Sequence, residues 1–165
     1  WHNERMASLN VELALANDRD ARPLALLARD LIESGLGWGY RPSRIAALIR
    51  DTDTVTLVAR AHAQPIGFAV MRFGDERAHL ILLAVEREHQ RRGIGRRLIE
   101  WLLESAYVAG IASVHIELRA ANAPAYAFYR ALGFSETIRV PGYYRGRESA
   151  LRMIRMLRVA RLPQR

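Results

Sequence analysis

The chain has 165 residues, of which half are hydrophobic and a quarter charged, the balance of a globular domain rather than of a disordered chain. It contains no cysteine, which excludes disulfides, thiolate metal sites and a cysteine nucleophile. Its formal charge is +8 with a pI near 10.9, and such a surface favours anionic partners such as a phosphorylated cofactor, RNA or an acidic protein.

The apolar runs along the chain are short. The longest, such as 78–85, falls far below the ~20 residues that cross a bilayer, so we expect no membrane span. We also expect no signal peptide, and we therefore expect a cytoplasmic protein. No repeat or linker divides the sequence, and we expect a single domain over 1–165. Since the first residue is Trp1 rather than Met, we expect residues 1–5 to be an added or processed end. At the other end, we expect residues 158–165 to be a frayed tail.

The first half of the chain predicts two helices and four strands. Polar and apolar residues alternate over 10–16, and Asn17 to Asp20 offer caps for the helix that follows. A loop with two large aromatic residues, Trp38 and Tyr40, separates the two helices. The predicted elements are strand 10–16, helix 21–34 closed by Gly35, helix 42–50, strands 54–61 and 66–73 as a hairpin, and strand 78–85.

Two glycines turn the strand at 78–85 into the next helix, within the stretch Gln90-Arg91-Arg92-Gly93-Ile94-Gly95-Arg96. The first N–H groups of a helix have no partner and carry the positive end of its dipole, so they can bind a phosphate. The stretch also fits a plain tight turn with a solvated basic face. It is neither a P-loop, which needs Gly-Lys-Ser/Thr, nor a dinucleotide fingerprint, because Leu98 stands where a third small residue belongs.

The second half predicts a strand–helix–strand unit and a closing strand pair. A helix over 96–107 leads to strand 113–119, and connections of this length imply a right-handed crossover and parallel strands. Within that strand the alternation points Ile116 and Leu118 inward and Glu117 to the other face. The remaining elements are helix 123–132 and strands 134–140 and 149–157. The helix over 96–107, together with the turn before it, is expected to present an apolar face made of Ile94, Leu98, Trp101, Leu102 and Ser105.

Three motifs occur in a fixed order along the chain. Together they resemble the GNAT superfamily of acyl-CoA-dependent N-acetyltransferases over roughly 57–157, and most of all its branch that acetylates ribosomal-protein alanine. One departure is Glu86-Arg87, where such proteins often have Asp-Pro. The motifs are Gln90-x-x-Gly93-x-Gly95, then Ile116-Glu117-Leu118-Arg119-x-x-Asn122-x-x-Ala125, then Phe128-Tyr129-x-x-Leu132-Gly133-Phe134.

The resemblance implies an α/β fold of three layers, with a mixed, curved sheet of about seven strands between helices. The two central strands, which end at Val85 and Arg119, would run parallel and splay apart, and acetyl-CoA would lie in the gap. The residues that the resemblance assigns to acetyl-CoA are Leu83, Ala84, Val85, Arg91, Arg92, Gly93, Ile94, Gly95, Arg96 and Asn122.

The resemblance also assigns catalytic roles, with Glu117 as the base and Tyr129 as the acid. The attacking amine must be neutral, and deprotonation at pH 7 costs roughly 1.4 kcal/mol for an α-amine but about 4.6 for a lysine. A glutamate, with an ordinary pKa of about 4.3, needs partial burial or a bridging water to act as a base. Each of the two residues also has a purely structural interpretation. Glu117 could be a strand residue paired with Arg119, and Tyr129 could be a tyrosine of the hydrophobic core.

The acceptor is predicted to be a primary amine, most simply the N-terminus of a protein such as a ribosomal protein. Four loop aromatics are candidates to flank it, although loop aromatics are equally often packing lids: Trp38, Tyr40, Tyr143 and Tyr144. The alternatives are a small amine (a polyamine, amino acid or aminoglycoside), a non-catalytic acyl-CoA-binding regulator, or an RNA-binding module. We expect a monomer or weak dimer that needs no nucleic acid and, since its five histidines lack ligand spacing, no metal.

Overall fold

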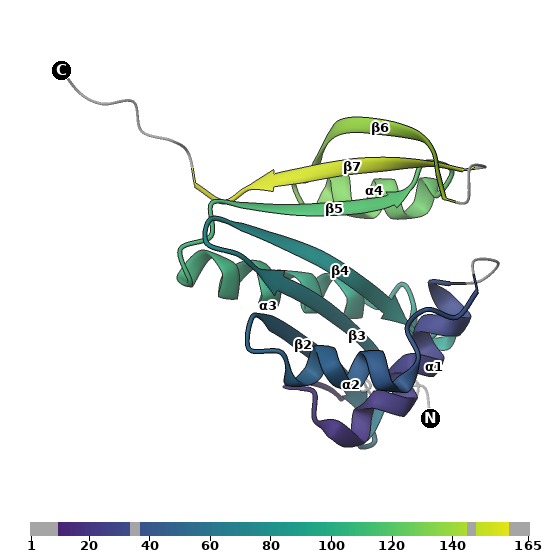
Figure 1. The fold of residues 1–165 in the computed structure, drawn as a ribbon. Helices are drawn as coiled ribbons and strands as arrows, with labels where there is room; N and C mark the ends of the chain where they lie inside the picture. The colour runs from purple at the N-terminus through teal and green to yellow at the C-terminus, as the bar shows by residue number, and fades with distance from the viewer. Residues whose placement is uncertain (1–9, 34–36, 145–147, 159–165) are drawn as a thin grey trace, which may run out of the picture.

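The computed structural model describes residues 10–33, 37–144 and 148–158 (Figure 1). Seven strands form one mixed sheet in the order β1-β2-β3-β4-β5-β7-β6, and only the β4–β5 neighbours are parallel. The strands are β1 (Val11–Leu15), β2 (Thr54–Ala61), β3 (Gln64–Phe73), β4 (Arg77–Val85), β5 (Ser113–Arg119), β6 (Ser135–Tyr144) and β7 (Glu148–Met156).

Helices cover both faces of this sheet, which confirms the expected three layers (Figure 1). The helices α1 and α2 pack on the face of β2, β3 and β4, and α3 packs on the opposite face, where residues of α4 also join the core. The helices are α1 (Ala21–Leu31), α2 (Pro42–Arg50), α3 (Ile94–Val108) and α4 (Ala123–Ala131), with single 3₁₀ turns η2 (Asp18–Asp20) and η3 (Arg87–His89).

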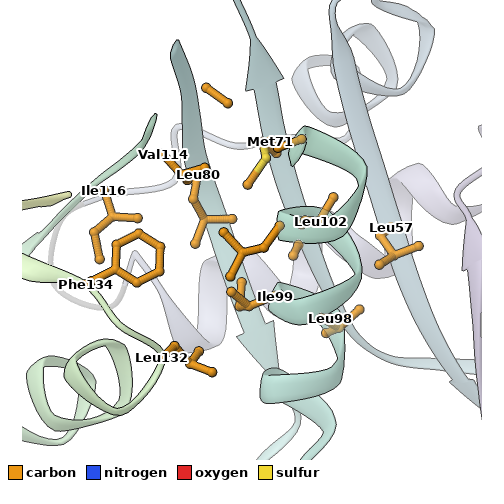
Figure 2. Close-up of a cluster of buried hydrophobic side chains, with 14 of the residues drawn as sticks. Leu57, Met71, Leu80, Leu98, Ile99, Leu102, Val114, Ile116, Leu132 and Phe134 are labelled. Atoms are coloured by element: carbon orange, nitrogen blue, oxygen red, sulfur yellow. The ribbon is translucent and has the colours of Figure 1, made fainter. Parts of the chain in front are cut away.

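The larger core lies between α3 and the sheet (Figure 2). Leu98 and Leu102 face the sheet as expected, but Trp101 does not, because it is 40% exposed. At 3.6 residues per turn, the two residues that follow Leu98 and Leu102 complete the buried stripe instead. These are Ile99 and Leu103, which pack with Ile94 and Ala106.

The elements otherwise lie close to their predicted ranges, with one clear difference. Strand β6 was expected to end at Val140, but it continues through Pro141 and Gly142 to Tyr144, with its register against β7 shifted after Val140. Proline cannot donate to a strand ladder, and it is tolerated here because β6 is an edge strand. The predicted closure of α1 by Gly35 falls outside the described residues.

The central parallel pair separates soon after it forms. Register pairs join β4 and β5 only at Arg77–Ser113, Ala78–Val114 and His79–His115. Just beyond, Ile81 is an extra residue in β4, because Val70 of β3 pairs with Leu82 and Met71 pairs with Leu80. A bulge of this kind bends and twists its strand. It therefore turns the end of β4 away from β5, and the two strands diverge in Figure 1.

A buried ion pair fastens α1 to the sheet. Asp20, which is 3% exposed, accepts two hydrogen bonds of 2.7 Å from Arg60 of β2 and one of 2.8 Å from the backbone N–H of Asn17. Burial alone would raise the pKa of Asp20, but these hydrogen bonds and the Arg60 charge outweigh it, so the pKa lies below its ordinary value. The start of α1 is thus fixed against the strand next to the sheet edge.

We predict that Asp20→Asn lowers the free energy of unfolding by about 3 kcal/mol, because it leaves Arg60 without its charged partner. The control is Asp18→Asn, whose pair with Arg50 is 65–69% exposed and whose loss should cost no more than about 0.5 kcal/mol. Urea unfolding measures both. Folding lowers the pKa of Asp20. Its contribution to the free energy of unfolding is therefore complete above about pH 4, the pKa of an aspartate in the unfolded chain, and is lost as the pH falls toward the pKa in the folded protein. Equal effects of the two variants would contradict this account.

Candidate active site

The N-terminus of α3 presents unpaired backbone N–H groups. Gly93 caps the helix with a φ of 79°, and the first helical hydrogen bond runs from the Arg97 N–H to the Gly93 carbonyl at 3.0 Å. The N–H groups of Ile94, Gly95 and Arg96 therefore have no partner within the helix. The side-chain amide of Gln90 donates to the Val85 carbonyl at 2.8 Å and so fastens this turn to the end of β4.

A long cleft of about 740 Å³ begins at this turn and runs between β4, α3 and α4. It is lined by every residue that we expected to bind acetyl-CoA except Arg92, which is exposed and lies outside it. Gly95 lies in the cleft between Phe128 and Val85, where a Cβ would make ordinary contacts of 3.5 Å with Phe128 and 3.8 Å with Val85. The expected residues that line the cleft are Leu83, Ala84, Val85, Arg91, Gly93, Ile94, Gly95, Arg96 and Asn122.

The end of β4 directs backbone donors toward the gap between the strands. The Glu86 N–H donates to the Ile66 carbonyl of β3 at 2.8 Å. Successive N–H groups of a strand point in opposite directions, so those of Val85 and Leu83 point away from β3, toward the side that β5 has left. The end of β4 can therefore hydrogen-bond a polar ligand in the gap.

A second, smaller cavity of about 270 Å³ lies between the diverging strands β4 and β5. Its walls include Glu117 of β5, Tyr129 of α4 and the aliphatic residues Leu31 and Ile32 at the end of α1. It shares four lining residues with the long cleft, so the two spaces are continuous. The shared residues are Leu31, Leu83, Asn122 and Ala125. Asn122 caps α4, with its side-chain oxygen accepting from the Ala125 N–H at 3.1 Å, and thus stands where the cavities meet.

Tyr129 lies in the gap with its ring fixed and its hydroxyl unused. Its ring packs edge-on against Phe128 and Phe134, with centroids 5.0 and 5.6 Å away. Among the described residues none forms a hydrogen bond with its hydroxyl. Burial raises the pKa of Tyr129 well above its ordinary value. The Tyr129 hydroxyl is therefore a protonated donor that no residue of the described chain uses.

Glu117 lies on the opposite face of β5 from the buried Ile116 and Leu118, as the alternation predicted. It is paired with Arg152, at 2.9 Å, rather than with Arg119. The reason is register: Arg152 lies directly opposite Glu117 on the antiparallel strand β7, and facing residues are closer than residues two apart on one strand. Arg119 instead pairs with Glu148 at 3.4 Å.

Two of the four loop aromatics lie near Glu117. The Tyr143 hydroxyl hydrogen-bonds the Glu117 carboxylate, which raises the pKa of Tyr143, and Tyr40 is near enough to add to that shift. The Trp38 indole N–H is engaged by the carbonyls of Ala25, at 3.2 Å, and Tyr40, at 3.0 Å, so Trp38 holds the loop against α1. The backbone of Tyr144 ends β6, and the position of its side chain lies outside the described part.

Two features of the site were not predicted from the sequence. The end of α1, with Leu31 and Ile32, closes over the strand gap although it lies some fifty residues before β4 along the chain. Arg152 was also missed, although a pairing of the expected strands 113–119 and 149–157 would have placed it opposite Glu117. Over the ranges 10–33, 37–144 and 148–158, no cluster of three or more His, Cys, Asp or Glu residues is arranged to hold a metal. In the same ranges no helix is long and apolar enough to span a membrane.

Comparison with known proteins gives consistent results. Residues 25–134 match the Acetyltransferase (GNAT) family. Over 89 residues the chain is 39% identical to the [Ribosomal protein bS18]-alanine N-acetyltransferase of Escherichia coli, covering 52% of this chain and 60% of that one. Over 118 residues it is 32% identical to an N-alpha-acetyltransferase of Sulfurisphaera tokodaii, covering 64% and 71%.

The fold agrees with these matches. The crystal structure of the ribosomal-protein-S18-alanine N-acetyltransferase from Escherichia coli superposes with a TM-score of 0.81 at 25% identity, over 92% of this chain and 96% of that one. The family match spans α1 to α4 and thus both cavities, with the glycine turn and the diverging strands between them. The chain belongs to the GNAT acetyltransferase family.

Proposed function

We propose that the protein transfers an acetyl group from acetyl-CoA to the N-terminal α-amine of a polypeptide. The observation that carries the proposal is the unpartnered Tyr129 hydroxyl in a gap that continues into a cleft ending at free helix N–H groups. Such an arrangement suits a ligand with an anionic end and a reactive end. The relatives reported above include enzymes named for the acetylation of protein N-termini.

The residues present fit acetyl-CoA. The N–H groups of Ile94, Gly95 and Arg96 and the guanidinium of Arg91 suit its pyrophosphate. The outward N–H groups of Leu83 and Val85 suit the amide and thioester carbonyls of its arm. Asn122, at the junction of the two cavities, would contact the arm where it enters the strand gap.

The reaction needs a proton removed from the amine and one supplied to sulfur. The neutral amine attacks the thioester carbonyl, the C–N bond forms, and the C–S bond breaks as the tetrahedral intermediate collapses. Glu117, engaged by Arg152 and Tyr143, would accept the amine proton through water. Tyr129 is protonated at neutral pH, since tyrosine titrates near 10 and burial raises its pKa further, so it can stabilise the departing thiolate by a hydrogen bond. The raised pKa opposes full proton transfer to a sulfur whose thiol has an ordinary pKa of about 8.5, and the thiolate takes up its proton from solvent.

The shape of the acceptor side favours a polypeptide over a small polycation. A polyamine site would be expected to hold several free carboxylates, whereas the described lining of the gap contains one, Glu117, which is already paired. Tyr143, beside Glu117, is 48% exposed, so the rim opens to solvent rather than closing into a pocket. An extended chain can leave the site along this rim.

The test is a thiol-release assay with acetyl-CoA and three matched sets of acceptors. These are peptides with a free α-amine, the same peptides N-blocked and carrying a lysine, and small polyamines. We expect turnover on the free α-amines only, because that amine is the least costly to deprotonate. Turnover confined to polyamines would overturn the choice of acceptor, and absence of turnover together with tight acetyl-CoA binding would overturn the proposed activity.

We predict that Tyr129→Phe lowers kcat by at least about tenfold and leaves the Kd for acetyl-CoA unchanged, because one hydroxyl interaction of the reacting state is lost. Steady-state kinetics and calorimetric titration measure the two quantities. Tyr126→Phe is the matched control, since Tyr126 lies on the same helix, is partly buried and does not line either cavity. An unchanged kcat in Tyr129→Phe would remove this hydroxyl from the mechanism.

We predict that Gly93→Val raises the Kd for acetyl-CoA by at least about tenfold. A Cβ at Gly93 meets nothing within 4 Å, but the φ of 79° is disfavoured for a β-branched residue, so the turn that presents the N–H groups must distort. Gly110→Val is the control, because Gly110 has a φ of 88°, equally open surroundings and a position at the far end of α3. If both variants bind acetyl-CoA alike, the glycine turn is not the anion site.

A further inference from the structure

Arginine side chains stack on the aromatic residues beside the acceptor side of the gap. The guanidinium of Arg44 lies 4.1 Å from the ring centroid of Tyr40, and that of Arg41 lies 5.0 Å from the Trp38 ring. Arg29 contacts the same Trp38 ring at 5.4 Å. A guanidinium held over an aromatic ring keeps its N–H edge free for a second partner. We call Arg41 and Arg44 with their two rings the arginine–aromatic patch.

The rings of this patch are held in place by the loop between α1 and α2. The Glu33 carboxylate accepts hydrogen bonds from the Gly39 N–H at 2.8 Å and from the Tyr40 N–H at 3.0 Å. The Trp38 indole donates to backbone carbonyls of α1 and of the loop itself. The stacked guanidinium groups are therefore positioned before any ligand arrives, which reduces the entropy lost on binding.

The patch has an excess of positive charge. Asp30 pairs with Arg29 and Glu117 pairs with Arg152, whereas Glu33 accepts hydrogen bonds from the loop N–H groups and keeps its negative charge beside the patch. Arg41 and Arg44 are exposed, and neither forms an ion pair with any carboxylate of the described chain. The three arginines, Arg29, Arg41 and Arg44, exceed the two nearby carboxylates, Asp30 and Glu33, by one charge, and the exposed guanidinium groups of Arg41 and Arg44 favour a ligand with carboxylate groups.

The patch is continuous with the place where the amine must react. Tyr40 carries Arg44 on its ring and packs with Trp38 on the same hydrophobic cluster as Leu31 and Ile32, which line the strand gap beside Glu117. A peptide whose α-amine lies near Glu117 advances about 3.3 Å per residue when extended. Side chains downstream of the N-terminus can therefore pass the patch as the chain leaves the gap.

We propose that Arg41 and Arg44 bind acidic side chains of the acceptor polypeptide downstream of the acetylated N-terminus. The inference rests on the proposed function and narrows its substrate class. Stacking leaves each guanidinium free to hold a carboxylate by two hydrogen bonds, which gives direction as well as charge. The arginine–aromatic patch thus selects acceptors by their downstream sequence, while the gap selects the amine.

The test uses three peptides that share their first two residues and differ at positions three to six, which are Glu/Asp, Ser/Gln or Lys. We expect kcat/KM to be about tenfold higher for the acidic than for the neutral peptide, through KM, and to fall with added salt. Arg41→Glu with Arg44→Glu should abolish or reverse this order. The matched control is Arg19→Glu with Arg22→Glu, which makes the same charge change at the opposite end of α1 and should keep the order.

A binding measurement separates this inference from the proposed activity. Fluorescence anisotropy with a labelled, N-acetylated acidic peptide needs no turnover. Binding that depends on Arg41 and Arg44 supports the patch even if no peptide is acetylated. Turnover that ignores the downstream residues, equal losses in the two double variants, or displacement of the peptide by a single-stranded RNA that binds more tightly would each overturn it.

Discussion

The separation of β4 from β5 is the constraint on which the rest of the structure depends. Only three register pairs join these strands, and a parallel ladder abandoned in mid-sheet leaves backbone groups without partners. The bulge at Ile81 bends β4 away from β5, and Gly67 lets β3 stay close to the bent strand, because a Cβ there would lie 2.9 Å from the Ala84 carbonyl of β4. The unpaired strand ends then face the cavity between the strands, which Tyr129 of α4 also lines.

Much of this arrangement could be predicted from the sequence because it follows from local periodicity and turn chemistry. The alternation in 113–119 placed Glu117 opposite the buried Ile116 and Leu118. The glycine turn before α3 was readable because a left-handed residue before a helix favours glycine, and Gly93 has that conformation. The family motifs joined these local features to Asn122 and Tyr129, and the structure places them around two continuous cavities.

The features that were missed depend on strand register and on packing between distant segments. Arg119 was the nearest arginine in sequence to Glu117, but the ladder placed Arg152 opposite it. Pro141 indicated the end of a strand, and only the position of β6 at the sheet edge explains why the strand continues. Trp101 was predicted to lie on the apolar face of its helix, yet the stripe that fits the sheet passes through Ile99 and Leu103.

The charges around the gap differ in a way that bears on the choice of acceptor. Inside it, Tyr129 is neutral and partly buried, and the Glu117 carboxylate is engaged by Arg152 and Tyr143. An α-amine costs about 3 kcal/mol less to deprotonate at neutral pH than a lysine, so it demands less of the base. Outside it, Arg41 and Arg44 stack on aromatic rings and form no ion pair with a carboxylate of the described chain. On the proposed function, the amine is therefore selected by its acidity in the gap, and the protein that carries it is selected by charge at the rim.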